Sequence, residues 1–236
     1  MKSMVAKTAG QLLALCLASA VALGQAAQVP TGTPLSETQR IVINNGSEVA
    51  SLDPQKTEGV PESNVIRNLL EGLVETDNNG QIVPGVAASW RQEQGRVWTF
   101  TLRDNARWSN GEPVTAQDFV YSWQRLADPK TASPYASYLQ AADVGNIDAI
   151  LAGKAPPTEL AVKALDAHHL QVTLSEAVPY FIDMLAHTAM KPVYRAAVEK
   201  WGEQWTQPQH YVGNGAYTLA DWVVTEKIVL KCNPQY

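Results

Sequence analysis

Hydrophobic and polar residues alternate most regularly over residues 97–103. Trp98, Phe100 and Leu102 would face one side, and Thr99, Thr101 and Arg103 the other. A period of two predicts a β-strand with one buried face. A second pattern follows, in which apolar residues recur at the spacing of one helix face and predict an amphipathic helix: Phe119, Val120, Trp123 and Leu126.

The segment between these two patterns contains turn and helix-start signals. Asn110-Gly111 predicts a tight turn, because glycine adopts the left-handed backbone conformation that such turns need. Thr115 has Asp118 three residues later, which is typical of a capping box at the start of a helix. Residues 97–126 are therefore predicted to form a strand, a turn and a helix in succession.

Comparable signals predict the other elements. Strands are expected at residues 39–44, 217–222 and 227–231, and hairpins around the turns at 77–80 and 166–169. Helices are expected at residues 62–73, 142–151, 180–187 and 195–201, and an irregular segment at 127–138. Hairpins outnumber parallel crossovers, so the residues alone indicate an α/β or α+β fold.

The composition is that of a folded globular protein. Of the 236 residues, 45% are hydrophobic and 17% are charged, and the formal net charge is -5. This length accommodates one large or two small domains. The absence of any basic block argues against binding to nucleic acid.

Residues 1–26 have the pattern of a secretory signal peptide. Two lysines precede an apolar stretch at residues 12–23 that is too short to span a membrane, and cleavage is expected after Ala26. Lipidation at Cys16 is the alternative, but Leu15 stands before it where a small residue is expected. Export would leave a soluble chain whose net charge is -7, because the removed segment carries two lysines and no acid.

Cys232 would then be the one remaining cysteine of the chain. A single cysteine cannot form an internal disulfide, and an unpaired thiol is unusual in an exported protein. Cys232 is therefore expected either to be a buried small hydrophobic residue or to have its partner outside this sequence.

Two blocks of sequence resemble the bacterial oligopeptide-binding proteins, which are extracytoplasmic receptors of peptide ABC transporters. The first block is W-T-F-T-L-R at 98–103, followed by W-S-N-G-E-P-V-T-A-Q-D-F-V-Y-S-W at 108–123. The second is G-N-G-A-Y at 213–217, with Trp222 and the N-P-Q-Y of residues 233–236. Receptors of murein peptides are similar in the first block. The resemblance covers nearly all of residues 27–236, but less than half of a family member.

This resemblance implies an α/β fold of the type-II periplasmic binding protein class, in the subclass with an extra domain. Residues 27–70 and 195–236 would form parts of the first lobe, and residues 71–194 the extra α/β domain. The chain stops inside the second block, so it is expected to be truncated before the second lobe, which closes over the ligand in this family.

The resemblance also implies a peptide-binding site. In the family, the loop matching Glu58, Gly59 and Val60 hydrogen-bonds the main chain of an extended peptide as if adding a strand. The family tyrosine that matches Tyr135 lies near the free amino terminus of the peptide, whose charge partner is an aspartate of the later domain. That aspartate has no counterpart here, so weak binding is expected. Without the resemblance, Glu58 and Glu62 would form a charged helix entry, and Tyr135 a packing anchor.

The sequence lacks the motifs of common catalytic and metal sites. No G-x-S-x-G and no P-loop occurs, and none of the four histidines has H-x-x-x-H spacing. A protein that is not an enzyme and needs no cofactor or metal is therefore expected. By resemblance, it would be the solute-binding component of a peptide ABC importer, a monomer that delivers short peptides to an inner-membrane permease and that truncation impairs.

An alternative is a secreted, non-catalytic interaction module, in which residues 71–194 bind another surface. Seven tryptophans could form a surface that stacks on carbohydrate, but their positions within predicted strands and helices favour a core. These residues are Trp90, Trp98, Trp108, Trp123, Trp201, Trp205 and Trp222.

Overall fold

The computed structural model describes residues 31–34 and 36–236, which fall into two units, one ending at Ile43 and one beginning at Asn44. The predicted signal peptide and its cleavage position lie outside the described residues. The described part of the first unit, residues 31–34 and 36–43, contains no helix or strand.

The strand predicted at residues 39–44 is therefore wrong. Ile41, Val42 and Ile43 are 82%, 81% and 74% exposed and are in irregular backbone. Consecutive apolar residues indicate a strand only if neighbouring strands pair with it and cover both faces. No segment among the described residues pairs with these three, so this apolar stretch does not form a strand.

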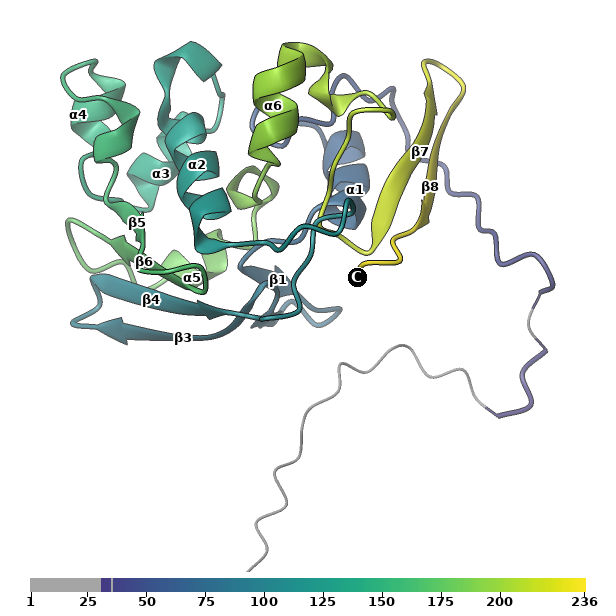
Figure 1. Ribbon diagram of the computed structural model, residues 1–236, viewed down its shortest axis with the longest axis horizontal. Helices are drawn as coiled ribbons and strands as arrows, with labels where there is room; N and C mark the ends of the chain where they lie inside the picture. The colour runs from purple at the N-terminus through teal and green to yellow at the C-terminus, as the bar shows by residue number, and fades with distance from the viewer. Residues whose placement is uncertain (1–30, 35) are drawn as a thin grey trace, which may run out of the picture. The chain divides into compact units, whose positions relative to one another are not determined.

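The second unit is built around a four-stranded antiparallel sheet (Figure 1). Its strands, in spatial order, are β3 (Ala87–Glu93), β4 (Val97–Leu102), β6 (His169–Thr173) and β5 (Val162–Ala164). Two hairpins accompany the sheet: β1 (Val74–Thr76) with β2 (Ile82–Pro84), and β7 (Tyr217–Val223) with β8 (Lys227–Cys232). The mixed α/β class is confirmed, and every strand pair in the described part is antiparallel.

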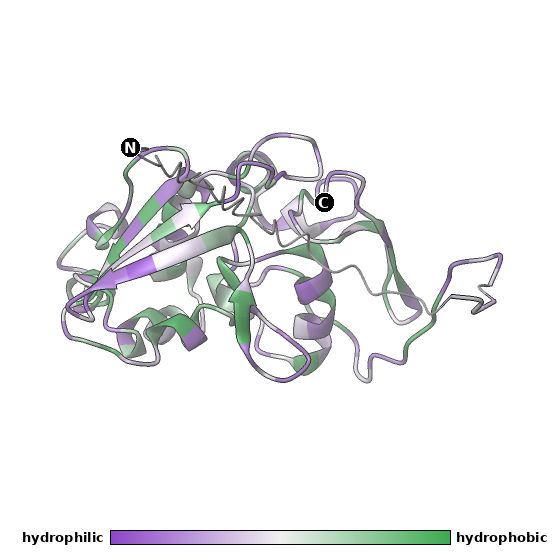
Figure 2. Ribbon diagram, turned by 90° about the horizontal axis from the view of Figure 1, so that it is seen from below, coloured by the Kyte–Doolittle hydropathy of each residue, from purple (hydrophilic) through white to green (hydrophobic). Residues whose placement is uncertain are grey.

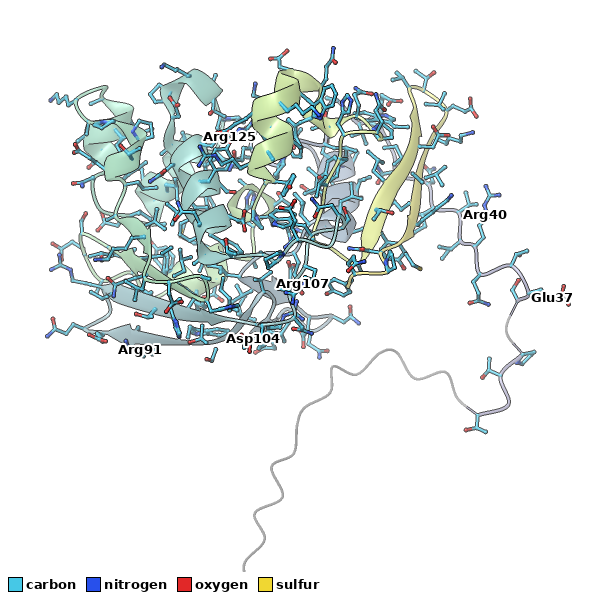
Figure 3. The ribbon with its side chains drawn as sticks, viewed as in Figure 1. Glu37, Arg40, Arg91, Asp104, Arg107 and Arg125 are labelled. Atoms are coloured by element: carbon cyan, nitrogen blue, oxygen red, sulfur yellow. The ribbon has the colours of Figure 1, made fainter. Side chains whose placement is uncertain are left out.

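The apolar face of the sheet follows the predicted alternation. Trp98 and Phe100 on β4 are paired with Val172 and Leu170 on β6, and all four side chains are buried. The opposite face carries polar side chains such as Arg91, which is paired with Thr99. Figure 2 shows hydrophilic and hydrophobic stretches alternating along the strands, and Figure 3 shows Arg91 at the side of the sheet away from the helices.

Helices cover the apolar face. They are α2 (Ala116–Ala127), α3 (Ala136–Ala141) and α4 (Ile147–Leu151), and α2 contacts both β5 and β6 (Figure 1). The capping box of α2 is confirmed, since the Thr115 N–H donates to Asp118 Oδ2 at 2.7 Å. The four apolar residues predicted to share a face of α2 are all buried.

The remaining helical elements are ten residues long or shorter. They are α1 (Val60–Leu69), α5 (Phe181–Met184), α6 (Arg195–Trp201) and four 3-10 turns, η1 (Pro129–Thr131), η2 (Pro157–Glu159), η3 (Thr188–Met190) and η4 (Gly202–Thr206). The helix predicted at 142–151 is α4 alone, because Asp143 and Asn146 adopt left-handed backbone conformations that interrupt it. The segment predicted to be irregular, 127–138, contains η1 and the start of α3.

Most of the tryptophans belong to the core, as their spacing predicts. Trp98, Trp108, Trp123 and Trp205 are buried, and Trp90 and Trp222 are half-buried and pack on the core. Trp201 is 38% exposed. Cys232, at the end of β8, is exposed, so the interpretation of this residue as a buried small hydrophobe is wrong.

Candidate functional site

The Glu58-Gly59-Val60 segment forms the entry to α1. Gly59 is the N-cap, Val60 is the first helical residue and Pro61 follows in the first turn. Pro is well suited to this place, because the first N–H groups of a helix have no intrahelical acceptor. Glu58 and Val60 are exposed, with Val60 at 73%. The structure therefore presents this segment on the surface at a helix N-terminus.

The main chain of this segment has unused hydrogen-bonding groups. Within the described residues, the N–H groups of Glu58, Gly59 and Val60 and the Glu58 carbonyl have no hydrogen-bond partner. Glu58 and Val60 are exposed and Gly59 is half-buried, so these three donors and one acceptor are open to another chain, as the free groups at the edge of a sheet are. An extended chain could pair with such an edge without any contact to its own side chains.

The Glu62 side chain packs against this segment, beside Gly59. Its carboxylate is buried, and Oε1 accepts a hydrogen bond of 2.8 Å from the Ala50 N–H. A Cβ atom added to Gly59 would lie 1.8 Å from Glu62 Oε2, so the Glu62 carboxylate would have to move to admit a side chain at this position. Glu62 also complements the dipole at the helix start. The charged helix entry is thus made by Glu62, while Glu58 points to solvent.

The other end of α1 is fixed by the Gly213-Asn214-Gly215 turn. The Asn214 side chain accepts from the Glu71 N–H at 3.0 Å and donates to the Glu71 carbonyl at 2.9 Å. A Cβ on Gly213 would lie 2.2 Å from the Leu69 carbonyl oxygen, so a side chain cannot replace this glycine. The helix predicted over 62–73 therefore ends at Leu69, because tertiary contacts with this turn hold the following backbone extended.

Tyr135 lies in an aromatic cluster. It is the N-cap of α3, and its ring centroid is 4.5 Å from that of His187 and 6.3 Å from that of Tyr138. The Tyr138 and His187 rings are 4.7 Å apart. Tyr135 is half-buried, so both of its expected roles, packing anchor and ligand contact, are compatible with this placement.

The two predicted parts of the site are linked only indirectly, through the length of α1. His187 is the N-cap of η3, and η3 packs against α1. Arg67, on α1, lies close enough to influence the ionisation of His187. No hydrogen bond joins Tyr135 to Glu58, Gly59 or Val60 in the described part of the chain.

The sequence does not indicate that His187 and Tyr138 belong to this cluster, because His187 only stands at the end of the helix expected at residues 180–187. Nothing local marks them, because Tyr138 and His187 are far apart in the sequence and meet only in the fold. His187 Nδ1 accepts a hydrogen bond from the Ala189 N–H at 3.1 Å. This bond fixes the neutral tautomer in which the proton is on Nε2.

We expect the imidazole of His187 to titrate below the ordinary histidine value of 6.5. Burial, and to a lesser extent the Arg67 guanidinium, lowers its pKa. The folded state then binds this proton less readily than the unfolded state, so stability falls as the pH drops below 6.5. A proton NMR titration measures the midpoint.

The replacement Arg67→Gln should raise the pKa of His187, because it removes a cation. Arg91→Gln, on the polar face of the sheet, is the matched control and should leave the midpoint unchanged. A midpoint at or above 6.5 in the unmodified chain would contradict the burial of a neutral imidazole against the two tyrosines.

The described residues hold no group of three or more histidine, cysteine or acidic side chains that could bind a metal ion. Among the same residues, no helix combines the length and apolar character needed to cross a membrane.

A family model described as bacterial extracellular solute-binding proteins, family 5 Middle, matches residues 81–236. The chain is 60% identical over 235 residues to the periplasmic oligopeptide-binding protein OppA of Salmonella typhimurium, covering 100% of this chain and 42% of that protein. It is 52% identical over 220 residues to the periplasmic murein peptide-binding protein MppA of Escherichia coli, covering 93% of this chain and 41% of that protein.

A solved structure is similar as well. The Haemophilus influenzae OppA complex with the peptide RPPGFSPFR gives a TM-score of 0.83 at 50% sequence identity, covering 86% of this chain and 40% of that chain. The chain thus spans about two fifths of the length of these relatives. The sequence blocks, the α/β fold and these similarities lead to one conclusion: the chain belongs to the bacterial extracellular solute-binding proteins of family 5.

Proposed function

We propose that this chain is part of the extracytoplasmic receptor of a peptide ABC importer, and that it contacts short peptides through Glu58, Gly59, Val60 and Tyr135. The observation that carries the proposal is the unpartnered main chain at the entry to α1. Relatives whose names state oligopeptide or murein-peptide binding support the ligand class. The relative solved with RPPGFSPFR supports it too.

The domain division follows the same proposal. Residues 27–70 and 195–236 contribute to a first lobe, and residues 71–194 form the extra α/β domain. Peptide would be trapped by closure of a second lobe over this surface, a motion common among such receptors. The receptor would be a periplasmic monomer, exported through a signal peptide that is cut after Ala26, and would deliver peptide to an inner-membrane permease. Catalysis is not part of this role.

The alternative, an interaction module that uses residues 71–194, receives less support. The tryptophans that could have formed its surface, Trp98, Trp108 and Trp123, are buried in the core. A pull-down with the permease separates the two functions, because only a transport receptor should be retained.

Peptide contact is tested by titrating the ¹⁵N-labelled chain with trialanine and, separately, with trilysine. Both peptides should shift the amide resonances of Glu58, Gly59 and Val60, because main-chain pairing does not depend on side chains. Val60→Pro removes one free donor at a helix position where Pro is favoured, and Gly59 already has a backbone compatible with a following Pro. Val60→Ala keeps that donor and is the matched control.

Val60→Pro should weaken binding by roughly two- to tenfold, the worth of one hydrogen bond, while Val60→Ala binds as the unmodified chain does. Equal affinity of the two variants would show that the peptide does not use this N–H. Shifts confined to other parts of the chain would contradict the proposed site.

A further inference from the structure

The segment that leads into the proposed peptide site, residues 52–57, is irregular in structure but mostly buried. Leu52, Asp53 and Gln55 are each at most 3% exposed, and Thr57 is also buried. Such a segment needs hydrogen-bond partners for its polar groups. They come from three separate parts of the chain, and they converge on Asp53.

The Asp53 carboxylate receives four donors. Arg125 Nη2 donates to Oδ2 at 2.6 Å and Arg125 Nη1 to Oδ1 at 3.2 Å. The Gln55 N–H donates to Oδ1 at 3.0 Å, and Trp205 Nε1 to Oδ2 at 3.3 Å. The side chains of Asp53 and Arg125 are 4% and 13% exposed. This is a two-point ion pair with satisfied acceptors on both carboxylate oxygens.

Gln55 extends the network. Its Oε1 accepts from Arg125 Nη1, and its Nε2 donates to the Ser122 carbonyl at 2.6 Å. Arg125 and Ser122 both belong to α2, and Figure 3 shows Arg125 on that helix. Trp205, which also donates to Asp53, belongs to a different element, η4.

The backbone on either side of Asp53 is also bound. The Tyr211 hydroxyl donates to the Leu52 carbonyl at 3.3 Å, and the Thr57 hydroxyl to the Asp53 carbonyl at 3.2 Å. These hydrogen bonds therefore fix the chain as far as Thr57, and the free main-chain groups begin at the next residue, Glu58.

We propose that Asp53 and Arg125 are positioning residues, which hold the main chain of Glu58, Gly59 and Val60 in the conformation that pairs with a peptide. This inference rests on the proposed function, because it concerns the same surface. An anchored segment loses less conformational entropy on binding than a mobile one, so anchoring raises affinity without contacting the ligand. Neither Asp53 nor Arg125 needs to touch the peptide.

The first test needs no peptide. In ¹⁵N relaxation measurements, the heteronuclear NOE of Glu58 and Gly59 should fall in Arg125→Met. Arg103→Met is the matched control, because it removes the guanidinium partner of another buried carboxylate, that of Glu71, at the same 2.6 Å distance. Arg103→Met should leave these two NOE values unchanged, even where it lowers overall stability.

The second test measures affinity for trialanine in the same variants. Arg125→Met should weaken binding roughly tenfold, since freeing one backbone residue costs about 1–2 kcal/mol, while Arg103→Met binds as the unmodified chain does. Should Arg125→Met fail to fold, Arg125→Lys and Trp205→Phe remove fewer of the contacts to Asp53 and should show smaller changes in the same direction.

Unchanged NOE values in Arg125→Met, or an equal fall in Arg103→Met, would overturn the positioning role. Failure of the proposed function looks different: the unmodified chain would show no trialanine shifts at Glu58, Gly59 and Val60, while the comparison of NOE values would still decide whether Asp53 and Arg125 hold this segment.

Discussion

Replacing Trp123 with alanine is expected to lower the free energy of unfolding by about 3–5 kcal/mol, the usual cost of removing a large buried aromatic side chain. Trp123 is fully buried on α2 and packs within the core. Its indole Nε1 donates a hydrogen bond of 3.0 Å to the Met190 carbonyl in η3. Truncation would leave both a cavity and a buried carbonyl without its partner, and each of these destabilises the fold.

Two further variants are compared with Trp123→Ala in urea unfolding followed by circular dichroism, one that tests the hydrogen bond and one at a partly exposed tryptophan. Trp123→Phe keeps an aromatic ring but loses the hydrogen bond, and should cost about 1–3 kcal/mol. Trp201→Ala removes a partly exposed tryptophan that stacks on His210, and should cost about 1 kcal/mol. If Trp123→Ala were no more costly than Trp201→Ala, the assignment of α2 to the centre of the core would be wrong.

The stretch around Trp123 was also the easiest to predict, because several local signals agree there. The alternation of β4, the Asn110-Gly111 turn and the Thr115 capping box indicate a strand, a turn and a helix start in the order in which the structure contains them. The hairpins at 77–80 and 166–169 were predictable for the same reason, since turn residues stand between short apolar strands.

Strand β3 was not predicted, because its side chains carry no alternating pattern. It is an edge strand whose residues are mostly exposed, and its pairing with β4 is what makes it a strand. The one local signal is Gln94-Gly95, where both residues have positive φ angles and form the connecting turn. The wrong strand at 39–44 shows the converse, an apolar pattern that has no pairing partner among the described residues.

The candidate site also has features that the sequence indicates and features that only the fold reveals. Glu58, Gly59 and Val60 were selected through resemblance to a family, and the residues alone indicated only a helix entry. Their unpartnered main chain became visible in the structure. The Asp53 and Arg125 pair joins positions 72 residues apart, and nothing in the neighbouring sequence of either residue indicates its partner.

In the ion pair between Lys191 and Glu75, replacing Glu75 should lower the free energy of unfolding more than replacing Lys191. Lys191 Nζ contacts Glu75 Oε1, and the Lys191 side chain is 0% exposed, whereas Glu75 is 27% exposed. Glu75→Gln leaves a fully buried ammonium group without this counter-charge and should cost about 3 kcal/mol. Lys191→Met leaves a carboxylate that reaches solvent and still accepts from the Gly72 N–H, and should cost about 1–2 kcal/mol.

The pH dependence of unfolding gives an independent check. Burial lowers the pKa of Lys191 below 10.5, and Glu75 partly offsets this effect, so Glu75→Gln should lower the pKa further. Between the lowered value and 10.5, the unfolded state binds more protons than the folded state, and the free energy of unfolding therefore rises with pH. The deficit of Glu75→Gln relative to the unmodified chain should accordingly shrink as the pH approaches 10.5.

The double variant Lys191→Met/Glu75→Gln completes the cycle, measured by urea unfolding at neutral pH. It should be more stable than Glu75→Gln alone, because the second substitution removes the uncompensated buried charge. A double variant that is less stable than both single variants would mean that the cost of Glu75→Gln does not arise from Lys191. A stability deficit of Glu75→Gln that stays constant as the pH rises would lead to the same conclusion. The cost of an unpaired buried ammonium group should disappear as Lys191 loses its proton.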